Sequence, residues 1–305
     1  MKPIVVVGSI NMDLVSVTHR APAPGETVFG TDFQMYSGGK GANQAVAVAR
    51  LGYPSVLLGK VGNDVFGSQL LELLDAEGVD VSGIERVSGS TGTASIVVDS
   101  RGENSIIVTP AANLEVSPEY LDSKQHILRD AGMVLAQLEI PLTTVDDLAR
   151  RCEEFAVPFM LDPAPAQLLS AETMARVAWL TPNQTEARFY GKGAGEVDAA
   201  VNCLLGQGVR HVILKRGVDG AVIANGDGKP FFIESFTVKA IDTTAAGDSF
   251  NGAFAVAQMR GLNAKDSARY AAAAAAVSVT RKGAQSSLPT RDEVDRLLFG
   301  SEEMV

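Results

Sequence analysis

Short apolar runs alternate with helical patterns along most of the chain. Residues Ile4 to Val7 are continuously apolar and precede Gly8, which predicts a buried parallel strand. Five further runs of strand length have the same character, at residues 56–58, 133–137, 159–162, 179–181 and 211–215. Such runs, separated by helical or loop sequence, predict a mostly parallel sheet with helices on both faces.

Helices are predicted where small or apolar residues recur at a spacing of three or four. One runs from Gly41 to Leu51 and ends before Gly52, and another surrounds Leu70 to Leu74 and ends at Gly78. Six consecutive alanines, residues 271–276, predict a helix that packs closely against a neighbour.

Two stretches break the alternation of strand and helix. Residues 11–36 and 91–108 show the two-residue period of β-strands, for example from Thr93 to Asp99, without a helical pattern between the strands. We expect antiparallel strands that form a small lid, with an extension of the main sheet's edge as the alternative. The predicted domains are therefore an α/β unit of residues 1–10, 37–90 and 109–305, and a discontinuous lid of residues 11–36 and 91–108.

Composition narrows the possible partners. The chain has 305 residues, of which 46% are hydrophobic and 20% charged, so it is not a disordered protein. Its formal net charge of −10 argues against nucleic acid or an anionic membrane as a partner. A polyanionic ligand would have to be held locally, and the 30 glycines leave room for backbone N–H groups to approach one.

Several classes of protein are disfavoured by what the sequence lacks. The two cysteines, Cys152 and Cys203, form no zinc or redox motif, and the three histidines are dispersed. We find no signal-peptide layout and no apolar stretch of about 18 residues, so we expect a cytoplasmic protein. No Gly-Lys pair is followed by Ser or Thr, and neither a dinucleotide-binding fingerprint nor a nucleophile elbow occurs.

The segment Asp242–Phe250 carries the first candidate chemistry. Its small residues, Ala245, Ala246 and Gly247, lead into an apolar helical run, so their N–H groups would favour an anion at a helix N-terminus. Asp248 would lie beside that anion. An acidic residue there is either a helix cap or the general base that takes a proton from an attacking hydroxyl.

The N-terminal region carries a second cluster. In the segment Ser37–Asn43, a glycine turn opens a helix, which suits close approach to a polar ligand but also fits a plain helix start. Asn11 and Asp13 are two residues apart, so in a strand both side chains project from one face. Their amide and carboxylate groups suit the hydroxyls of a polyol, and a surface turn is the alternative.

These two motifs, in this order and at this spacing, resemble those of the ribokinase-type carbohydrate kinases. Further similar segments span essentially the whole chain: 8–13, 162–166, 181–186 and 281–285. The resemblance implies a three-layer α/β/α ribokinase-like fold with a β-sheet lid. It also implies transfer of the ATP γ-phosphoryl group to the 5-hydroxyl of D-ribose, and a homodimer formed through the lid.

The resemblance implies roles at matching positions. Asp248 would be the general base, and the N–H groups of Ala245, Ala246 and Gly247 would form an anion hole. The sugar would be bound by Asn11, Asp13, Gly38, Gly39, Lys40, Asn43, Glu139 and Asp248. Nucleotide contacts would come from Asn183, Lys215, Arg216, Gly217, Gly220, Gly247 and Ala272.

Two cations are implied by the same resemblance. Glu186 would act on Mg²⁺ through water, and an activating K⁺ or similar monovalent cation would lie near the anion hole. The matching positions for the second cation are Asp242, Thr244, Ser278, Arg281, Gly283 and Ser287. A departure occurs at Lys215-Arg216-Gly217, where such kinases often have Thr-Leu-Gly, and this leaves the nucleotide preference open.

Other functions stay compatible with the motifs. A deoxyribokinase, a fructokinase or another sugar or nucleoside kinase of the same family would share them. A sugar-binding regulatory protein without catalysis is a further alternative, although such a protein would be expected to lack Asp248 or Gly247, and both are present.

Overall fold

A nine-stranded sheet forms the middle layer of the computed structural model, which describes residues 1–191, 197–226 and 230–300. From edge to edge the strands are β15 (Phe231–Ile233), β14 (Ala221–Asn225), β13 (His211–Lys215), β12 (Trp179–Leu180), β11 (Phe159–Leu161), β10 (Met133–Ala136), β1 (Ile4–Val7), β4 (Ser55–Leu58) and β6 (Val79–Asp80). Along this order, each pair from β13 to β6 is parallel, and among the described strands of this sheet only β14 runs in the opposite direction, antiparallel to both β13 and β15. The predicted mostly parallel sheet is confirmed.

Helices cover both faces of this sheet because its central strands are apolar on both sides. In β1, Ile4 and Val6 face one core, against α1 (Lys40–Arg50), α2 (Val65–Ala76), α9 (Ala246–Met259), α10 (Ala264–Ser278) and α11 (Arg291–Phe299). Val5 and Val7 face the other core, against α3 (Pro118–Ser123), α4 (Gln125–Asp130), α5 (Leu142–Glu154), α6 (Ala171–Arg176), α7 (Gln184–Tyr190) and α8 (Val197–Gly206). The three-layer α/β/α architecture is confirmed.

The predicted helix stops and the alanine-rich helix are also confirmed. Gly52 and Gly78 have φ angles of 73° and 81°, the left-handed conformation that glycine adopts without strain. The alanines of α10 are mostly buried and pack against α9. At Gly252 of α9, an added Cβ would lie 2.6 Å from the Cβ of Ala47, so small residues also let α1 and α9 approach closely.

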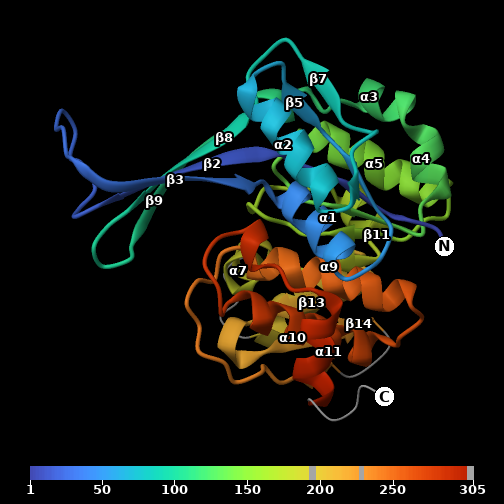
Figure 1. Cartoon of the computed structure of the whole chain (residues 1–305). Helices are drawn as coiled ribbons and strands as arrows, with labels where there is room; N and C mark the ends of the chain where they lie inside the picture. The colour runs from blue at the N-terminus through green and yellow to red at the C-terminus, as the bar shows by residue number, and fades with distance from the viewer. Residues whose placement is uncertain (192–196, 227–229, 301–305) are drawn as a thin grey trace.

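A second sheet projects from the α/β body as an arm (Figure 1), with the strand order β3 (Gly30–Gly38), β2 (Asn11–Thr18), β8 (Gly92–Val98) and β9 (Asn104–Thr109). The two outer pairs are antiparallel, as expected. The expectation of antiparallel pairing is wrong for the central pair, because β2 and β8 are parallel. Both strands leave the body in the same direction, and each returns through its own partner.

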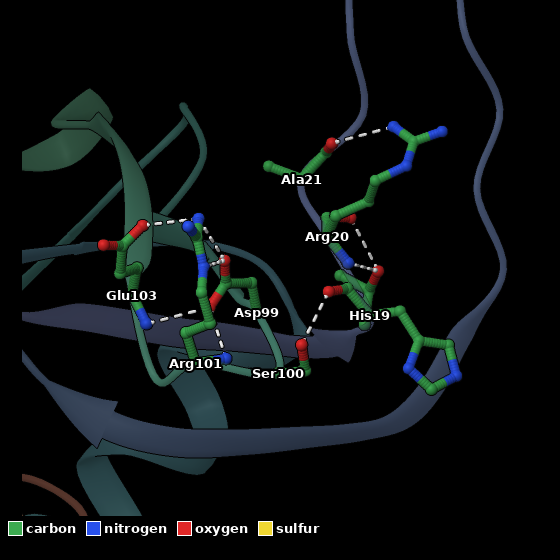
Figure 2. Close-up of polar contacts among 8 residues, drawn as sticks. His19, Arg20, Ala21, Asp99, Ser100, Arg101 and Glu103 are labelled. Carbon is green, nitrogen blue, oxygen red and sulfur yellow. Dashed lines mark hydrogen bonds and ion pairs between the residues drawn. The ribbon is translucent and has the colours of Figure 1, made fainter.

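Hydrogen bonds tie the two lid segments together near the tip of the arm (Figure 2). Ser100, in the turn between β8 and β9, donates its hydroxyl to the His19 carbonyl just after β2, at 3.0 Å. Arg101 in the same turn pairs with Asp99 and Glu103. The turns at the tip are therefore ordered by polar contacts rather than by a core.

The remaining elements connect these layers. They are the two-stranded sheet β5 (Lys60–Gly62) with β7 (Glu85–Val87), and the short 3₁₀ turns η1 (Ala111–Glu115), η2 (Gly217–Asp219) and η3 (Gln285–Ser287). None of the helices in the described ranges combines the length and the apolar character needed to cross a membrane.

Candidate active site

The candidate site lies at the carboxyl edge of the central sheet. Val7, Ala136 and Leu161 are aligned at the ends of three neighbouring parallel strands. The chain reverses its direction of strand addition at β1, which lies between β4 and β10. The carboxyl ends of the strands at such a point are where open α/β sheets bind ligands.

Asp248 lies in the first turn of α9 and is 4% exposed. Its two carboxylate oxygens accept hydrogen bonds from Asn43 at 2.9 Å and from Gln44 at 3.1 Å, both from α1. Burial raises the pKa of Asp248 to about 6, with the Lys40 ammonium opposing the rise and the Asp162 carboxylate adding to it. A carboxylate with this pKa is ionised at neutral pH and can still accept a proton.

Lys40 and Glu139 lie close to Asp248. The Lys40 N–H donates to the Glu139 carboxylate at 3.3 Å, and Ser9 donates its hydroxyl to the same carboxylate. Burial disfavours the Lys40 ammonium, but the surrounding carboxylates outweigh it, so the pKa of Lys40 is raised above its usual value. This ammonium is therefore charged throughout the physiological range.

Asn11 and Asp13 lie at the base of the lid, on β2. Asn113 donates to the Asn11 side-chain oxygen at 2.7 Å, which fixes the orientation of the Asn11 amide. Burial, followed by the charges of Glu139 and Asp248, raises the pKa of Asp13 to about 7, against the lowering effect of Lys40. Asp13, Lys40, Glu139 and Asp248 thus form one electrostatic cluster.

Close backbone packing explains the glycines beside this cluster. Gly39 has a φ of 88°, and a Cβ added there would lie 2.7 Å from the Ser9 carbonyl oxygen. At Gly38 an added Cβ would lie 2.2 Å from the Asp13 carboxylate. Gly41 similarly contacts the backbone of Gly8. Side chains at these positions would displace the polar groups of the cluster.

The start of α9 presents backbone donors next to Asp248. Ala245 adopts a left-handed conformation, and the Ala246 N–H donates to the Thr243 carbonyl at 3.2 Å. Among the described residues, the N–H groups of Gly247 and Asp248 have no acceptor. A Cβ added at Gly247 would lie 3.4 Å from the Lys215 ammonium, so a cation and free N–H groups lie side by side.

Asn183 and Glu186 form a capping box at the start of α7. The Asn183 side chain accepts from the N–H groups of Thr185 and Glu186, while the Glu186 carboxylate accepts from the Asn183 N–H at 2.7 Å. Burial and the Asp162 charge raise the pKa of Glu186, against the lowering effect of Lys215. The cap of α7 therefore lies close to Asp162 and Lys215.

Lys215, the last residue of β13, contacts both Asp162 and Asn183. Its ammonium pairs with Asp162 at 3.1 Å, and a backbone bridge pairs it with Asn183. The buried Nε of Arg216 has no hydrogen-bond partner within the described residues, and its Nη2 lies 3.9 Å from Asp219 Oδ2. Gly217 and Gly220 form the turn before β14, and Ala272 lies on α10; in the ranges described, no hydrogen bond or ion pair joins these three to Asp248.

The predicted positions for a monovalent cation lie in two adjoining parts of the chain, the segment before α9 and the segment from the end of α10 to η3. The Asp242 carboxylate accepts from the Thr244 N–H and from the Gly283 N–H, both at 2.9 Å. Although burial favours its neutral form, these bonds and the Thr244 hydroxyl lower the pKa of Asp242. The Arg281 side chain instead pairs with Glu293. Ser278 and Ser287 are buried, and their hydroxyls donate to nearby carbonyls.

Comparison with known families decides the class of protein. The family model described as "pfkB family carbohydrate kinase" matches residues 1–291. The chain belongs to the pfkB family of carbohydrate kinases. The family and the ribokinase-like fold predicted from the sequence motifs are confirmed.

Individual members of the pfkB family are similar over nearly the whole chain. A ribokinase of Bacillus subtilis is 42% identical over 98% of this chain and 100% of its own. The structure of Arabidopsis thaliana ribokinase complexed with ribose and ATP has a TM-score of 0.93 at 35% identity, covering 98% of this chain and 99% of the other. A deoxyribokinase of Salmonella typhi is 34% identical over 98% and 99% of the two chains.

Sequence reasoning missed several polar residues of this pfkB-family kinase. Gln44 is buried beside Asp248, and the buried Gln137 donates to Gln44. Asp162 and Asn113 contribute further polar contacts to the site. A usable signal was present, because Gln44 and Asn43 are polar residues within the small and apolar helical pattern of residues 41–49. Such an amide inside a buried helix implies a polar partner, but the partner cannot be identified from spacing alone.

Proposed function

We propose that this kinase transfers the γ-phosphoryl group of ATP to the 5-hydroxyl of D-ribose. The observation that carries the proposal is the buried Asp248 carboxylate beside N–H groups at the start of α9 that have no acceptor in the part of the chain that the structure describes. Asp248 takes the hydroxyl proton as the new O–P bond forms and the bond between the β- and γ-phosphates breaks. The products are ADP and D-ribose 5-phosphate.

The sugar would be bound between β2 and the start of α1. Asn43 supports this role, because its Nδ2 donates to Asp248 while its buried Oδ1 has no partner among the described residues and can accept a sugar hydroxyl. Asp13 and Glu139 supply carboxylate acceptors, and Lys40 supplies a donor. Asn11 and the backbone of Gly38 and Gly39 complete the proposed sugar contacts.

The transferring phosphoryl group would lie at the start of α9. The N–H groups of Gly247 and Asp248, which have no acceptor in the described ranges, support this placement, as does the ammonium of Lys215. Ala245 shapes the turn through its left-handed conformation, and the Ala246 N–H, already bonded to Thr243, contributes less. Arg216, Gly217, Gly220 and Ala272 are proposed for the rest of the nucleotide.

The donor set near Glu186 fits magnesium held through water. The Glu186 oxygens each accept one bond from Asn183 and keep lone pairs that a metal-bound water can use. Mg²⁺ bound with ATP would neutralise charge on the phosphates. For a monovalent cation, Asp242 and Thr244 adjoin Gly283, whereas Arg281 would contribute only its carbonyl because its side chain pairs with Glu293.

We further propose that residues 11–36 and 91–108 act as a lid and that two copies pair through it in the cytoplasm. Large apolar side chains exposed on β3 and β9 support such pairing: Phe33, Met35, Ile106, Ile107 and Val108. A single species at the monomer mass in solution would contradict the dimer.

The Asp248→Asn variant tests the chemistry. We expect turnover to fall at least about 100-fold, with sugar affinity largely retained, because the amide cannot accept the hydroxyl proton. The measurement is the rate of ADP formation with ribose, Mg²⁺ and K⁺, together with ribose binding by calorimetry. Near-normal turnover would remove Asp248 from the role of base, and ribose binding without any wild-type turnover would favour a regulatory binding protein.

The sugar is tested by a panel of ribose, 2-deoxyribose and fructose with ATP consumption as the readout. The similarity to a deoxyribokinase makes 2-deoxyribose the closest competitor. We expect ribose to have the highest kcat/KM, because a buried carboxylate built for a hydroxyl is left unpaired by a sugar that lacks it. Faster turnover of either other sugar would overturn the substrate assignment.

A further inference from the structure

A buried amide links the two carboxylates at the centre of the site. Gln44, on α1, is 1% exposed. Its Nε2 lies 3.1 Å from Asp248 Oδ1 and 3.2 Å from Asp162 Oδ2. An amide nitrogen carries two hydrogens, so each carboxylate receives one of them.

The orientation of the Gln44 amide is determined by a third residue. Gln137, which follows β10 and is fully buried, donates its Nε2 to Gln44 Oε1 at 2.7 Å. If the Gln44 amide were reversed, its oxygen would face two carboxylates and its nitrogen would face the Gln137 donor. Both contacts would be repulsive, so only the observed orientation is compatible with the surroundings.

The second carboxylate is itself compensated. Asp162 accepts from the Lys215 ammonium through Oδ1, the oxygen that Gln44 does not use. An unbroken series of contacts therefore runs from Lys215 through Asp162 and Gln44 to Asp248. Without the amide, two buried carboxylates would face each other, and the ionised form of Asp248 would be disfavoured.

We propose that Gln44 is a positioning residue that holds Asp248 ionised and correctly oriented for proton abstraction, an inference that rests on the proposed role of Asp248 as general base. Among the described residues, the charged groups nearest Asp248 are Lys40 on α1, Asp13 on β2 and Asp162 after β11. Glu139, which contacts Lys40, and Lys215, which pairs with Asp162, lie next to these groups. Lys40 favours the ionised form, while Asp13 and Asp162 oppose it. Gln44 differs from Asn43, the second donor, because it also separates the two carboxylates.

The Gln44→Met variant tests this role, since methionine keeps the length of the side chain but has no N–H donor. The readout is the pH dependence of kcat at saturating sugar, which reports ionisation in the enzyme–substrate complex. We expect the acid limb of this profile to move upward by roughly one pH unit, so that kcat at pH 6 falls about fivefold relative to wild type. At pH 8 most of the activity should be retained.

Ser55→Ala is a matched control on β4, in a residue that contacts the same helix, α1. It removes one buried hydrogen bond, from the Ser55 hydroxyl to the Ala45 carbonyl at 2.8 Å, without touching either carboxylate. We expect reduced stability and an unchanged acid limb. A Gln44→Met enzyme that folds and keeps the wild-type acid limb would overturn the proposal.

Two more variants distinguish the possible failures. If Gln44→Met does not fold, Gln137→Met takes its place. That variant releases the Gln44 oxygen and should move the acid limb in the same direction by a smaller amount; an unmoved limb would again contradict the proposal.

Asp248→Asn should abolish the acid limb. If the limb persists in Asp248→Asn, the base assignment is wrong, whereas loss of the limb there without movement in Gln44→Met refutes only the role of Gln44. Should ribose not be the substrate, the profiles are taken on the best sugar of the panel.

Discussion

The side of the site that we propose for the sugar differs from the side proposed for the nucleotide in what holds it together. The proposed sugar side consists of Asp13, Lys40, Asn43, Glu139 and Asp248. Asn43 and Asp248, which share a hydrogen bond, are 205 residues apart in the sequence. On the side proposed for the nucleotide and its cations, called the nucleotide side below, Asn183 and Glu186 are three residues apart, and Asp242 and Thr244 are two residues apart. The sugar side therefore depends on the whole fold, and the nucleotide side mainly on local turns and caps.

This difference predicts larger effects for changes on the sugar side. A substitution there disturbs groups that are buried and bonded to distant elements, so the energetic cost and the loss of geometry combine. A substitution at a cap loses one local contact, and water can replace it.

The largest effect is expected for Gly39→Ala, where a left-handed backbone and a close carbonyl oxygen both oppose a side chain. We expect the free energy of unfolding to fall by about 2–4 kcal/mol and kcat/KM for the sugar to fall at least about 100-fold. Gly52→Ala is the control, because Gly52 has a similar φ of 73° but no atom within 4 Å of an added Cβ. Equal kinetic effects in the two variants would contradict the argument.

Asp13 should give the next largest effect, through pH. With a pKa of about 7, the free enzyme carries mostly protonated Asp13 at pH 6 and mostly ionised Asp13 at pH 8. Because the ionised form is the better acceptor for sugar hydroxyls, sugar KM should fall roughly tenfold between these pH values. In Asp13→Asn we expect sugar KM at pH 8 to rise about 100-fold and to lose this pH dependence. A wild-type KM that is constant from pH 6 to 8 would show that Asp13 does not control binding.

Lys215 lies beside Gly247 at the proposed phosphate site and also pairs with the buried Asp162. It therefore tests whether the two sides of the site can be separated. Lys215→Met leaves Asp162, which is 4% exposed, without its charge partner, and should lower the free energy of unfolding by about 3 kcal/mol. Loss of the ammonium beside Gly247 should also raise ATP KM about tenfold. Adding Asp162→Asn should restore stability but not ATP affinity, and recovery of both would place Lys215 outside the nucleotide site.

The smallest effect is expected for Asn183→Ala, which removes the cap of α7. We expect a loss of about 1 kcal/mol in the free energy of unfolding, a few-fold increase in ATP KM and no change in sugar KM. Asn263→Ala removes the equivalent cap of α10, where Asn263 accepts from the Asp266 N–H at 2.9 Å. That control should show the same loss of stability with ATP KM unchanged; a shared rise in ATP KM would mean that the effect is not local.

The elements and the family could be predicted because their signals are local. Strand β1 is a run of four apolar residues, and the helix stops at Gly52 and Gly78 follow from single glycines. The segments at 37–43 and 242–250 place small residues before helices, and such turns depend on few neighbours. The residues of these two short segments were therefore enough to indicate a phosphoryl-transfer site.

The polar contacts around Asp248 could not be predicted in the same way. Gln44, Gln137 and Asp162 lie on three different elements, and no periodicity relates one to another. The same limitation applies to the lid, where alternation predicted strands but not the parallel pairing of β2 with β8. Strand partners depend on the direction in which the chain leaves and re-enters the body.

By itself, the sequence determined which segments become helices and strands, which carry the kinase motifs, and that a net charge of −10 requires a phosphate to be held locally. Only the tertiary structure decided that one glutamine separates two buried carboxylates and that Lys215 compensates the second of them. The physical reason is the separation along the sequence over which each kind of interaction acts. Backbone propensities and turns act over a few residues, whereas hydrogen bonds and charges in a buried site join whichever elements the sheet order brings together.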